Sequence, residues 1–229
     1  MTISTPAALP ATIPADATLD EIRNALAPLI ADNAGFDGWS KDALALAAQQ
    51  AGVDPDVAAL AFAGGPVAMI DAWFADVDRV MTAALPKDVL AQDKIRARIS
   101  RQIEARLAAL APRRDALRRA QAVLAMPQNL PRAARLGWRS VDLMWRQAGD
   151  TATDYNHYTK RAILGGVYAA TISCFVNDTS EDWAETRAFL ARRIEGIMRF
   201  EKAKAGFAER TRNLPSLSRL IGRLRYPVV

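Results

Sequence analysis

The side chains best suited to binding or chemistry gather between residues 150 and 161, where carboxylates, aromatic rings and cations alternate. Tyr155, Tyr158 and Arg161 are spaced three residues apart, so on a helix they share one face. Aromatic rings and guanidinium groups are frequent anchors of protein partners. We predict a partner-binding surface formed by Asp154, Tyr155, His157, Tyr158 and Arg161. The alternative is that these residues serve ordinary helix capping and packing.

Patterns typical of catalysis or metal binding are sparse. His157 is the only histidine and Cys174 the only cysteine, whereas zinc and di-iron sites need several ligands on facing helices. The sequence contains no glycine-rich phosphate loop and no Glu-x-x-His pair. We therefore predict no metal, no cofactor and no enzymatic activity, and an enzyme of unknown type is the third hypothesis.

Apolar residues in two later segments could wall a ligand cavity, because a lipid tail requires a large apolar pocket with few polar groups. Gly165 and Gly166 remove side-chain volume, which serves either close helix packing or space for a ligand. We predict an isoprenoid or phospholipid ligand, in contact with Trp138, Val141, Met144, Trp145, Gly165, Val167 and Tyr168.

Helices must position all of these residues. The 229-residue chain is 51% hydrophobic, and helix formers dominate without the alternating pattern of strands. The fold class is therefore all-α. We expect helices over 19–33 behind the cap Thr18, over 40–50, over 55–62 behind the cap Asp54, from 66 to about 85, over 95–110, over 113–125, around 138–145, over 155–176 and up to about 208.

Two of these helices carry specific expectations about burial. In the helix over 95–110, isoleucines and leucines line one face, and the arginines, Arg106 among them, are expected on a solvated basic side. The helix over 155–176 is apolar on all sides from Ala162 onward, so it is expected to be buried.

The first four helices resemble the DNA-binding end of TetR-type repressors, through Ala51-Gly52-Val53 and the aromatic Phe62. DNA binding, however, requires Lys and Arg to neutralise phosphates. Between residues 24 and 78 the sequence contains one basic residue, Lys41, and eight aspartates. We predict that the chain binds no nucleic acid, although a TetR-like regulator sensing an apolar ligand is the main alternative.

The segment 148–164 is similar to the signature of the Coq-nine family of ubiquinone-biosynthesis proteins, and the resemblance extends over about 19–205. It implies a TetR-like helical bundle, with a helix-turn-helix-like part that does not bind DNA and a larger lipid-binding part. It further implies a homodimer, and a partnership with the di-iron hydroxylase of ubiquinone synthesis. The chain departs from the family pattern at His157, where Trp is usual, and at Ala63, where Pro is usual.

The C-terminal segment has the pattern of a short amphipathic helix. Leucines and Ile221 fall on one stripe and two arginines lie opposite, which predicts peripheral membrane contact through Leu217, Arg219, Leu220, Ile221, Arg223 and Leu224. Docking on the protein's own surface is the alternative. The net charge of +5 suits an anionic membrane. The sequence contains no stretch of eighteen apolar residues without a charge, so we expect no segment that spans a membrane. We expect a cytoplasmic protein, peripheral on the inner face of the membrane.

These expectations divide the chain into four parts. They are a flexible N-terminal tail (1–17), the helix-turn-helix-like part (18–65), the ligand-binding and dimerisation part (66–208) and the amphipathic C-terminal helix (214–226).

Overall fold

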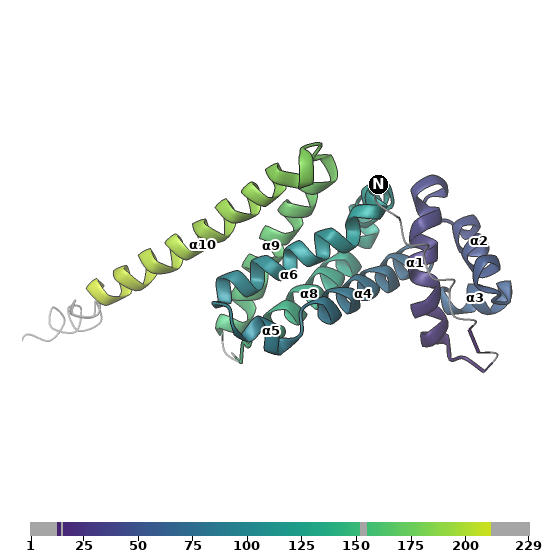
Figure 1. The fold of residues 1–229 in the computed structure, drawn as a ribbon, viewed down its shortest axis with the longest axis horizontal. Coiled ribbons are helices and arrows are strands. Elements are labelled where there is room, and N and C mark those ends of the chain that lie inside the picture. The colour runs from purple at the N-terminus through teal and green to yellow at the C-terminus, as the bar shows by residue number, and fades with distance from the viewer. Residues whose placement is uncertain (1–12, 15, 152–154, 212–229) are drawn as a thin grey trace, which may run out of the picture.

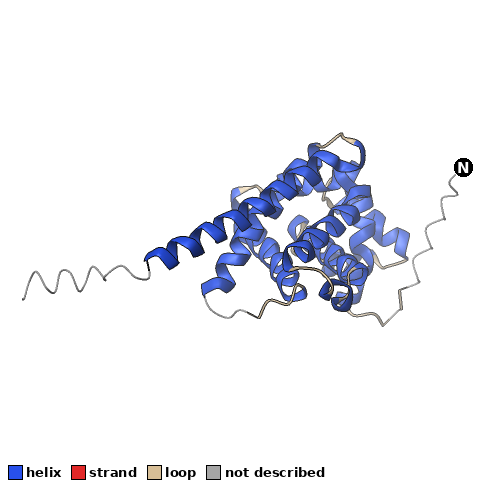
Figure 2. Ribbon diagram, turned by 60° about the vertical axis from the view of Figure 1, so that its left-hand side comes forward, coloured by secondary structure: helices blue, strands red, loops and turns tan. Residues whose placement is uncertain are grey.

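The computed structural model describes residues 13–14, 16–151 and 155–211, and every regular element in those residues is helical (Figure 1; Figure 2). The all-α prediction is therefore confirmed. In chain order the helices are α1 (Leu19–Asp37), α2 (Lys41–Ala51), α3 (Pro55–Ala61), α4 (Pro66–Ala84), α5 (Lys87–Ala91), α6 (Ile95–Leu110), α7 (Arg114–Leu124), α8 (Leu130–Gln147), α9 (Tyr155–Asn177) and α10 (Ala184–Thr211).

Local capping signals begin the first and third helices as expected. The Thr18 hydroxyl accepts from the backbone N–H of Glu21 (3.3 Å), and the Glu21 carboxylate accepts from the N–H of Thr18 (2.8 Å). This reciprocal pair is a capping box, which satisfies two donors that the helix leaves free. Asp54 caps α3, and Pro55 occupies its first position, where proline's missing N–H costs nothing.

The predicted end of α1 near Asn33 is wrong. The helix continues through Gly35 to Asp37, and Gly38 ends it with a φ of 71° that favours glycine. Gly35 costs the helix about 1 kcal/mol relative to alanine. The full burial of Ala34 in the same turn favours continuing the helix.

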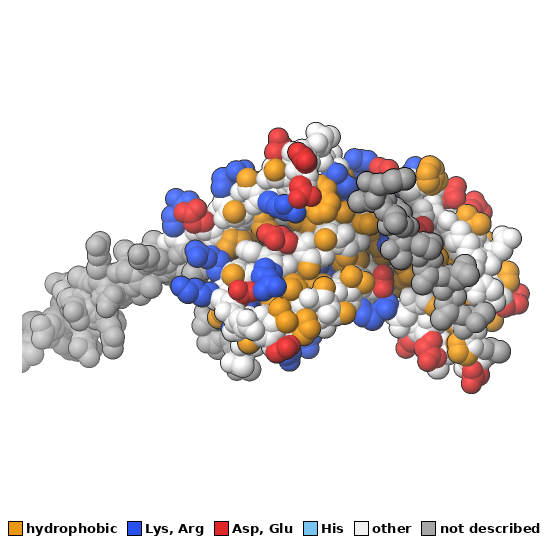
Figure 3. Space-filling model, in the orientation of Figure 1, with side chains coloured by type: hydrophobic (Ala, Val, Ile, Leu, Met, Phe, Trp, Pro, Cys, Tyr) orange, Lys and Arg blue, Asp and Glu red, His pale blue; other side chains and the backbone are white. Residues whose placement is uncertain are grey.

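Helices α1, α2 and α3 form the helix-turn-helix-like unit at one end of the molecule (Figure 1). Asp56, Val57 and Leu60 are exposed on α3, which carries no Lys or Arg. The face seen in Figure 3 likewise shows acidic and apolar side chains at this end, with Lys and Arg gathered over the rest of the molecule. This unit therefore lacks the cations that phosphate contacts need.

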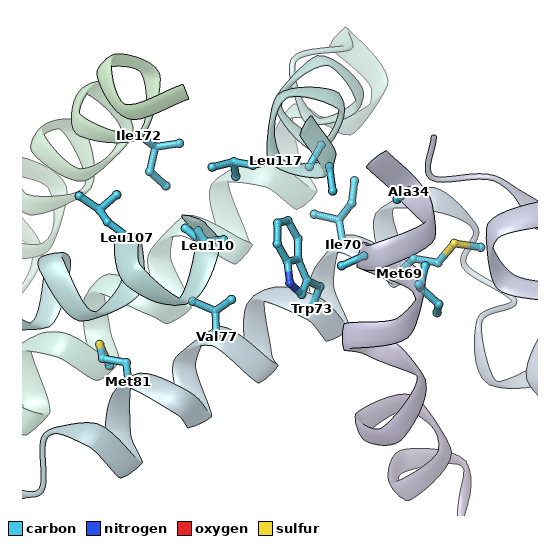
Figure 4. Close-up of a cluster of buried hydrophobic side chains, with 14 of the residues drawn as sticks. Ala34, Met69, Ile70, Trp73, Val77, Met81, Leu107, Leu110, Leu117 and Ile172 are labelled. Carbon is cyan, nitrogen blue, oxygen red and sulfur yellow. The ribbon is translucent and has the colours of Figure 1, made fainter. Parts of the chain in front are cut away.

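Trp73 on α4 lies at the centre of the main core, with Met69, Ile70, Val77 and Met81 on the same buried stripe (Figure 4). Leu107 and Leu110 of α6, Leu117 of α7 and Ile172 of α9 close around it (Figure 4). Each such side chain contributes about 1.5–3 kcal/mol through burial.

Trp39 joins the helix-turn-helix-like unit to this core. Its ring centroid lies 5.3 Å from that of Trp73, and its indole N–H donates to the carbonyl of Ala116 on α7 (3.0 Å). Tilted ring pairs of this kind add about 0.5–1.5 kcal/mol beyond area burial. The unit is thus held against the body by both apolar and polar contacts.

The expectation that Arg106 lies on a solvated face of α6 is wrong. Its side chain is fully buried, and its guanidinium forms an ion pair with Asp78 of α4. Its Nε donates to the Tyr168 hydroxyl of α9 (2.7 Å), while Ser140 of α8 donates to the second oxygen of Asp78 (3.2 Å). A polar network thus links four helices inside the core.

The expectation that α9 is buried on all sides is also wrong. Ala162, Gly166, Ala169 and Ser173 form an exposed stripe, and a Cβ added at Gly165 or Gly166 would meet nothing within 4 Å. Small residues pass for apolar in a hydropathy pattern, but in the described chain these four remain exposed, although Gln121 of α7 reaches Ser173 at one end (3.5 Å). We call this stripe the small-residue face.

Asp178 organises the turn between α9 and α10. It is buried, and it accepts hydrogen bonds from the N–H and hydroxyl of both Ser180 and Thr186. Burial opposes ionisation of this carboxyl, but the four donors outweigh burial and hold its pKa well below the usual range. Nearby on α9, half-buried Cys174 places its Sγ 3.8 Å from the Thr186 hydroxyl.

From this turn, α10 first packs against α9 and α6 through the buried Leu190 and Ile194. It then extends past the other helices (Figure 1) and ends at Thr211, close to the expected 208. The predicted amphipathic helix over 214–226, most of the N-terminal tail and Asp154 lie outside the described residues.

Within the described residues, no single helix has both the length and the apolar character needed to cross a membrane. Helices α3 and α4 pass this test only as a pair, and they are bent by 82° at the break between them.

Candidate partner-binding and lipid-contacting surfaces

An exposed aromatic cluster joins α8 to the start of α9. The ring centroid of Trp138 lies 6.0 Å from that of Tyr158 and 6.5 Å from that of His157, and the His157 and Tyr158 rings meet edge-on at 5.0 Å. Tyr158 is 62% exposed and Trp138 38%. We call these three residues the aromatic patch. It brings two predicted partner-binding residues together with Trp138, which the sequence had assigned to a lipid cavity.

Arg161 is not the exposed cationic anchor that its spacing predicted. Its side chain is only 2% exposed, and it donates to Asp142 of α8 (2.6 Å) and to Asp150 (3.1 Å). It also donates to the backbone carbonyl of His157 (3.0 Å). The guanidinium therefore holds the turn that carries the aromatic patch instead of meeting a partner directly.

The loop before α9 is fastened by further polar contacts. Lys160 pairs with Asp150 (2.8 Å), and its ammonium lies 5.5 Å from the centre of the Trp145 ring. The Trp145 indole donates to the carbonyl of Lys160 (3.2 Å). At the beginning of this loop, directly after α8, the carbonyl of Ala148 accepts a hydrogen bond from Arg98 of α6 (2.7 Å). These contacts fix α8 relative to the first turn of α9.

The seven residues predicted to contact lipid fall in several different settings. Val141 and Met144 are buried in the main core, as are Val167 and Tyr168 of α9. Trp145 is half-buried beside Lys160, and Trp138 belongs to the aromatic patch. Gly165 lies beside the small-residue face, with open space before it. Their contact with lipid stays a prediction.

Sequence reasoning missed Asp142 and Asp150, which neutralise and orient Arg161. Asp142 could have been found, because it lies one helical turn after Trp138 on the same side of α8. Asp150 gave no comparable signal, since it lies in a loop. Among the described residues, no group of three His, Cys, Asp or Glu side chains could hold a metal ion.

The aromatic patch and its supporting charges lie in a region that matches a known family. The model of the COQ9 family matches residues 130–201, which run from the start of α8 into α10. The chain carries a COQ9 domain. The resemblance to the Coq-nine family noted in the sequence is thereby confirmed.

Several relatives of the COQ9 domain bear the name ubiquinone biosynthesis protein COQ9, mitochondrial. The protein of Rattus norvegicus is 42% identical over 96 residues, covering 42% of this chain and 31% of the rat protein. The COQ9-A protein of Xenopus laevis is 32% identical over 168 residues, covering 70% of this chain and 53% of that protein. The chain thus spans between about a third and about half of the length of these two relatives.

The fold that carries the COQ9 domain has a neighbour among solved structures. The TetR transcriptional regulator from Nitrosomonas europaea ATCC 19718 superimposes with a TM-score of 0.61, covering 76% of this chain and 96% of that chain. The two sequences are 24% identical, so the likeness concerns the fold alone. The prediction of a TetR-like fold is confirmed.

Proposed function

We propose that this chain is a non-catalytic, lipid-binding accessory protein of ubiquinone biosynthesis, which works at a membrane surface together with the di-iron demethoxyubiquinone hydroxylase. The COQ9 domain over 130–201 carries this proposal, because the relatives that share it are named for ubiquinone biosynthesis.

The aromatic patch is the proposed surface for the hydroxylase. Trp and Tyr are enriched among the residues that dominate binding energy, since they bury a large area at little entropic cost. Here Trp138 and Tyr158 are exposed on a backbone held by Arg161. Such pre-organisation lowers the cost of association.

The proposed lipid is an isoprenoid or a phospholipid. A groove of about 300 Å³ between α6 and the start of α10 supports it, because Leu85, Leu107 and Trp183 give it apolar walls. Arg101, Glu104 and Arg187 also line this groove and suit a polar headgroup. This volume is at the lower limit of typical small-molecule pockets. It suits part of a chain-like ligand whose remainder lies on a membrane.

In the same proposal the protein is a homodimer. The small-residue face of α9 supports this arrangement, because small side chains let a second helix approach within the usual 8–10 Å between axes. Light scattering after size exclusion would measure the mass, and a monomer at all concentrations would contradict the dimer.

The patch is tested by measuring how tightly the purified full chain binds the hydroxylase. Tyr158→Ala and Trp138→Ala should each weaken binding by at least tenfold, or about 1.4 kcal/mol, as expected when a central aromatic anchor is truncated. Phe36→Ala is the matched control, because Phe36 is an exposed aromatic residue on α1, outside the COQ9 domain. Equal affinities of all three variants and the parent would remove the patch from the proposal.

A second experiment tests the pathway. Deleting the encoding sequence in its host should lower ubiquinone and raise its demethoxy precursor, as measured by mass spectrometry of lipid extracts. Unchanged levels of both compounds would contradict the proposed function.

A further inference from the structure

A basic groove of about 280 Å³ lies between the start of α4 and the first half of α8. Gly64, Val67 and Ala68 line one side, and Arg132, Arg135 and Arg139 line the other. A separate groove lies over the aromatic patch, where Trp138, His157 and Tyr158 line it, and the two grooves share no lining residue.

Two of these arginines have no partner within the described chain. Arg132 and Arg135 are exposed, and no ion pair or hydrogen bond involves their guanidinium groups in the part of the chain that the structure describes. Arg139 differs, because it forms an ion pair with Asp71, the single carboxylate that lines the groove. The lining therefore carries an excess of two positive charges.

The excess of positive charge in the groove does not stabilise the fold. Like charges one helical turn apart destabilise a helix by a few tenths of a kcal/mol. The start of α4 adds to the positive field, since helix N-termini carry a partial positive charge, and its first turn contains no acidic residue. The helix contributes only a partial charge, and the arginines contribute the two full positive charges that would attract a ligand.

The shape and chemistry of the groove define a ligand class. Guanidinium groups recognise phosphate through paired, charge-assisted hydrogen bonds, and two unpaired arginines match the two negative charges of a phosphate monoester. Val67, Ala68 and Leu136 add apolar walls. The groove is smaller than the usual pocket for a whole drug-sized molecule, so it suits a headgroup. A Cβ added at Gly64 would lie 3.0 Å from the Cβ of Ala68, so a side chain there would crowd this wall.

We propose that this groove binds a phosphate monoester, supplied either by a soluble metabolite or by a lipid whose headgroup is itself a phosphate monoester, as in phosphatidic acid. The inference goes beyond the proposed function, because it uses no residue of the aromatic patch or of the groove between α6 and the start of α10.

The test is isothermal titration calorimetry of the full chain at low salt, with two probes in separate arms. The probes are glycerol 3-phosphate and dihexanoyl phosphatidic acid below its micelle concentration. The double variant Arg132→Gln/Arg135→Gln should weaken binding of the effective probe by at least tenfold. The control, Arg96→Gln/Arg119→Gln, removes the same charge from two exposed arginines outside the groove, which have no ion pair among the described residues.

A second variant fills the groove without removing an arginine. Ala68→Glu places a carboxylate in the first turn of α4, where acidic residues stabilise a helix, so the fold should be kept. Binding should again fall by at least tenfold, and thermal unfolding of every variant should match that of the parent.

Binding of both probes supports the site, with the phosphate as the recognised group, and binding of the phosphatidic acid alone supports it with lipid as the source. Binding of glycerol 3-phosphate alone also supports the site, with a soluble phosphate ester as its ligand. If neither probe binds the parent, or if the control loses as much affinity as the groove variants, the inference is overturned.

Discussion

Replacing Asp78 with alanine would leave the Arg106 guanidinium in the core without its carboxylate. The side chains of Arg106 and Asp78 are 0% and 9% exposed, so bulk water has little access to the guanidinium. Breaking a buried pair from one side costs about 3–5 kcal/mol. This is a large share of the roughly 5–15 kcal/mol that stabilises a typical protein. For a chain of this size it corresponds to a melting temperature lower by about 6–20 °C.

The assay is urea unfolding followed by circular dichroism, with three proteins compared to the parent. Asp115→Ala is the surface control, since Asp115 pairs with Arg118 in the open and should cost within about 1 kcal/mol. Arg106→Met/Asp78→Leu removes both charges and should cost clearly less than Asp78→Ala, because no isolated charge is left in the core. If Asp78→Ala destabilises no more than Asp115→Ala, the buried pair does not have the assigned importance.

Three further predictions concern acid stability, DNA and the membrane. Asp178 has a lowered pKa in the folded state, so its stabilisation is present above the unfolded carboxyl pKa of about 3.9 and lost as the pH falls below it. Asp178→Asn should therefore melt lower than the parent near neutral pH, with a difference that shrinks in acid; a constant difference would contradict this. In anisotropy titrations at physiological salt the chain should show no sequence-specific DNA binding, and a salt-resistant specific complex would refute that expectation. Truncation after Asn213, or Leu220→Asp, should reduce flotation with anionic liposomes; if both float like the parent, the tail is not the membrane-binding element.

Features that depend on neighbouring residues were predictable from the sequence. The Thr18 cap and the Asp54–Pro55 start of α3 each follow from a few adjacent residues. Within the aromatic patch, His157 and Tyr158 follow one another and were predicted together, whereas Trp138 lies on another helix and was assigned to a lipid cavity. The family signature over 148–164 also lies within one short segment.

Features that depend on distant residues were missed. Arg106 was expected in water because nothing near it in the sequence reveals Asp78, 28 residues earlier on another helix. Arg161 was expected at the surface for the same reason, since Asp142 lies 19 residues before it. Small residues such as Gly166 posed a different difficulty. Their burial depends on whether another helix covers them, and hydropathy alone does not say so.

The single cysteine offers a way to observe the α9–α10 turn in solution. Cys174 is half-buried against Thr186, and Thr186 is one of the two residues that tie Asp178 into the turn. A thiol reacts as its thiolate and only where a reagent can reach it. The rate of thiol modification, compared with that of a free thiol, therefore reports how closely this turn covers the thiol. Because the chain has no second thiol, the unmodified protein is already a single-site probe of the packing between α9 and α10.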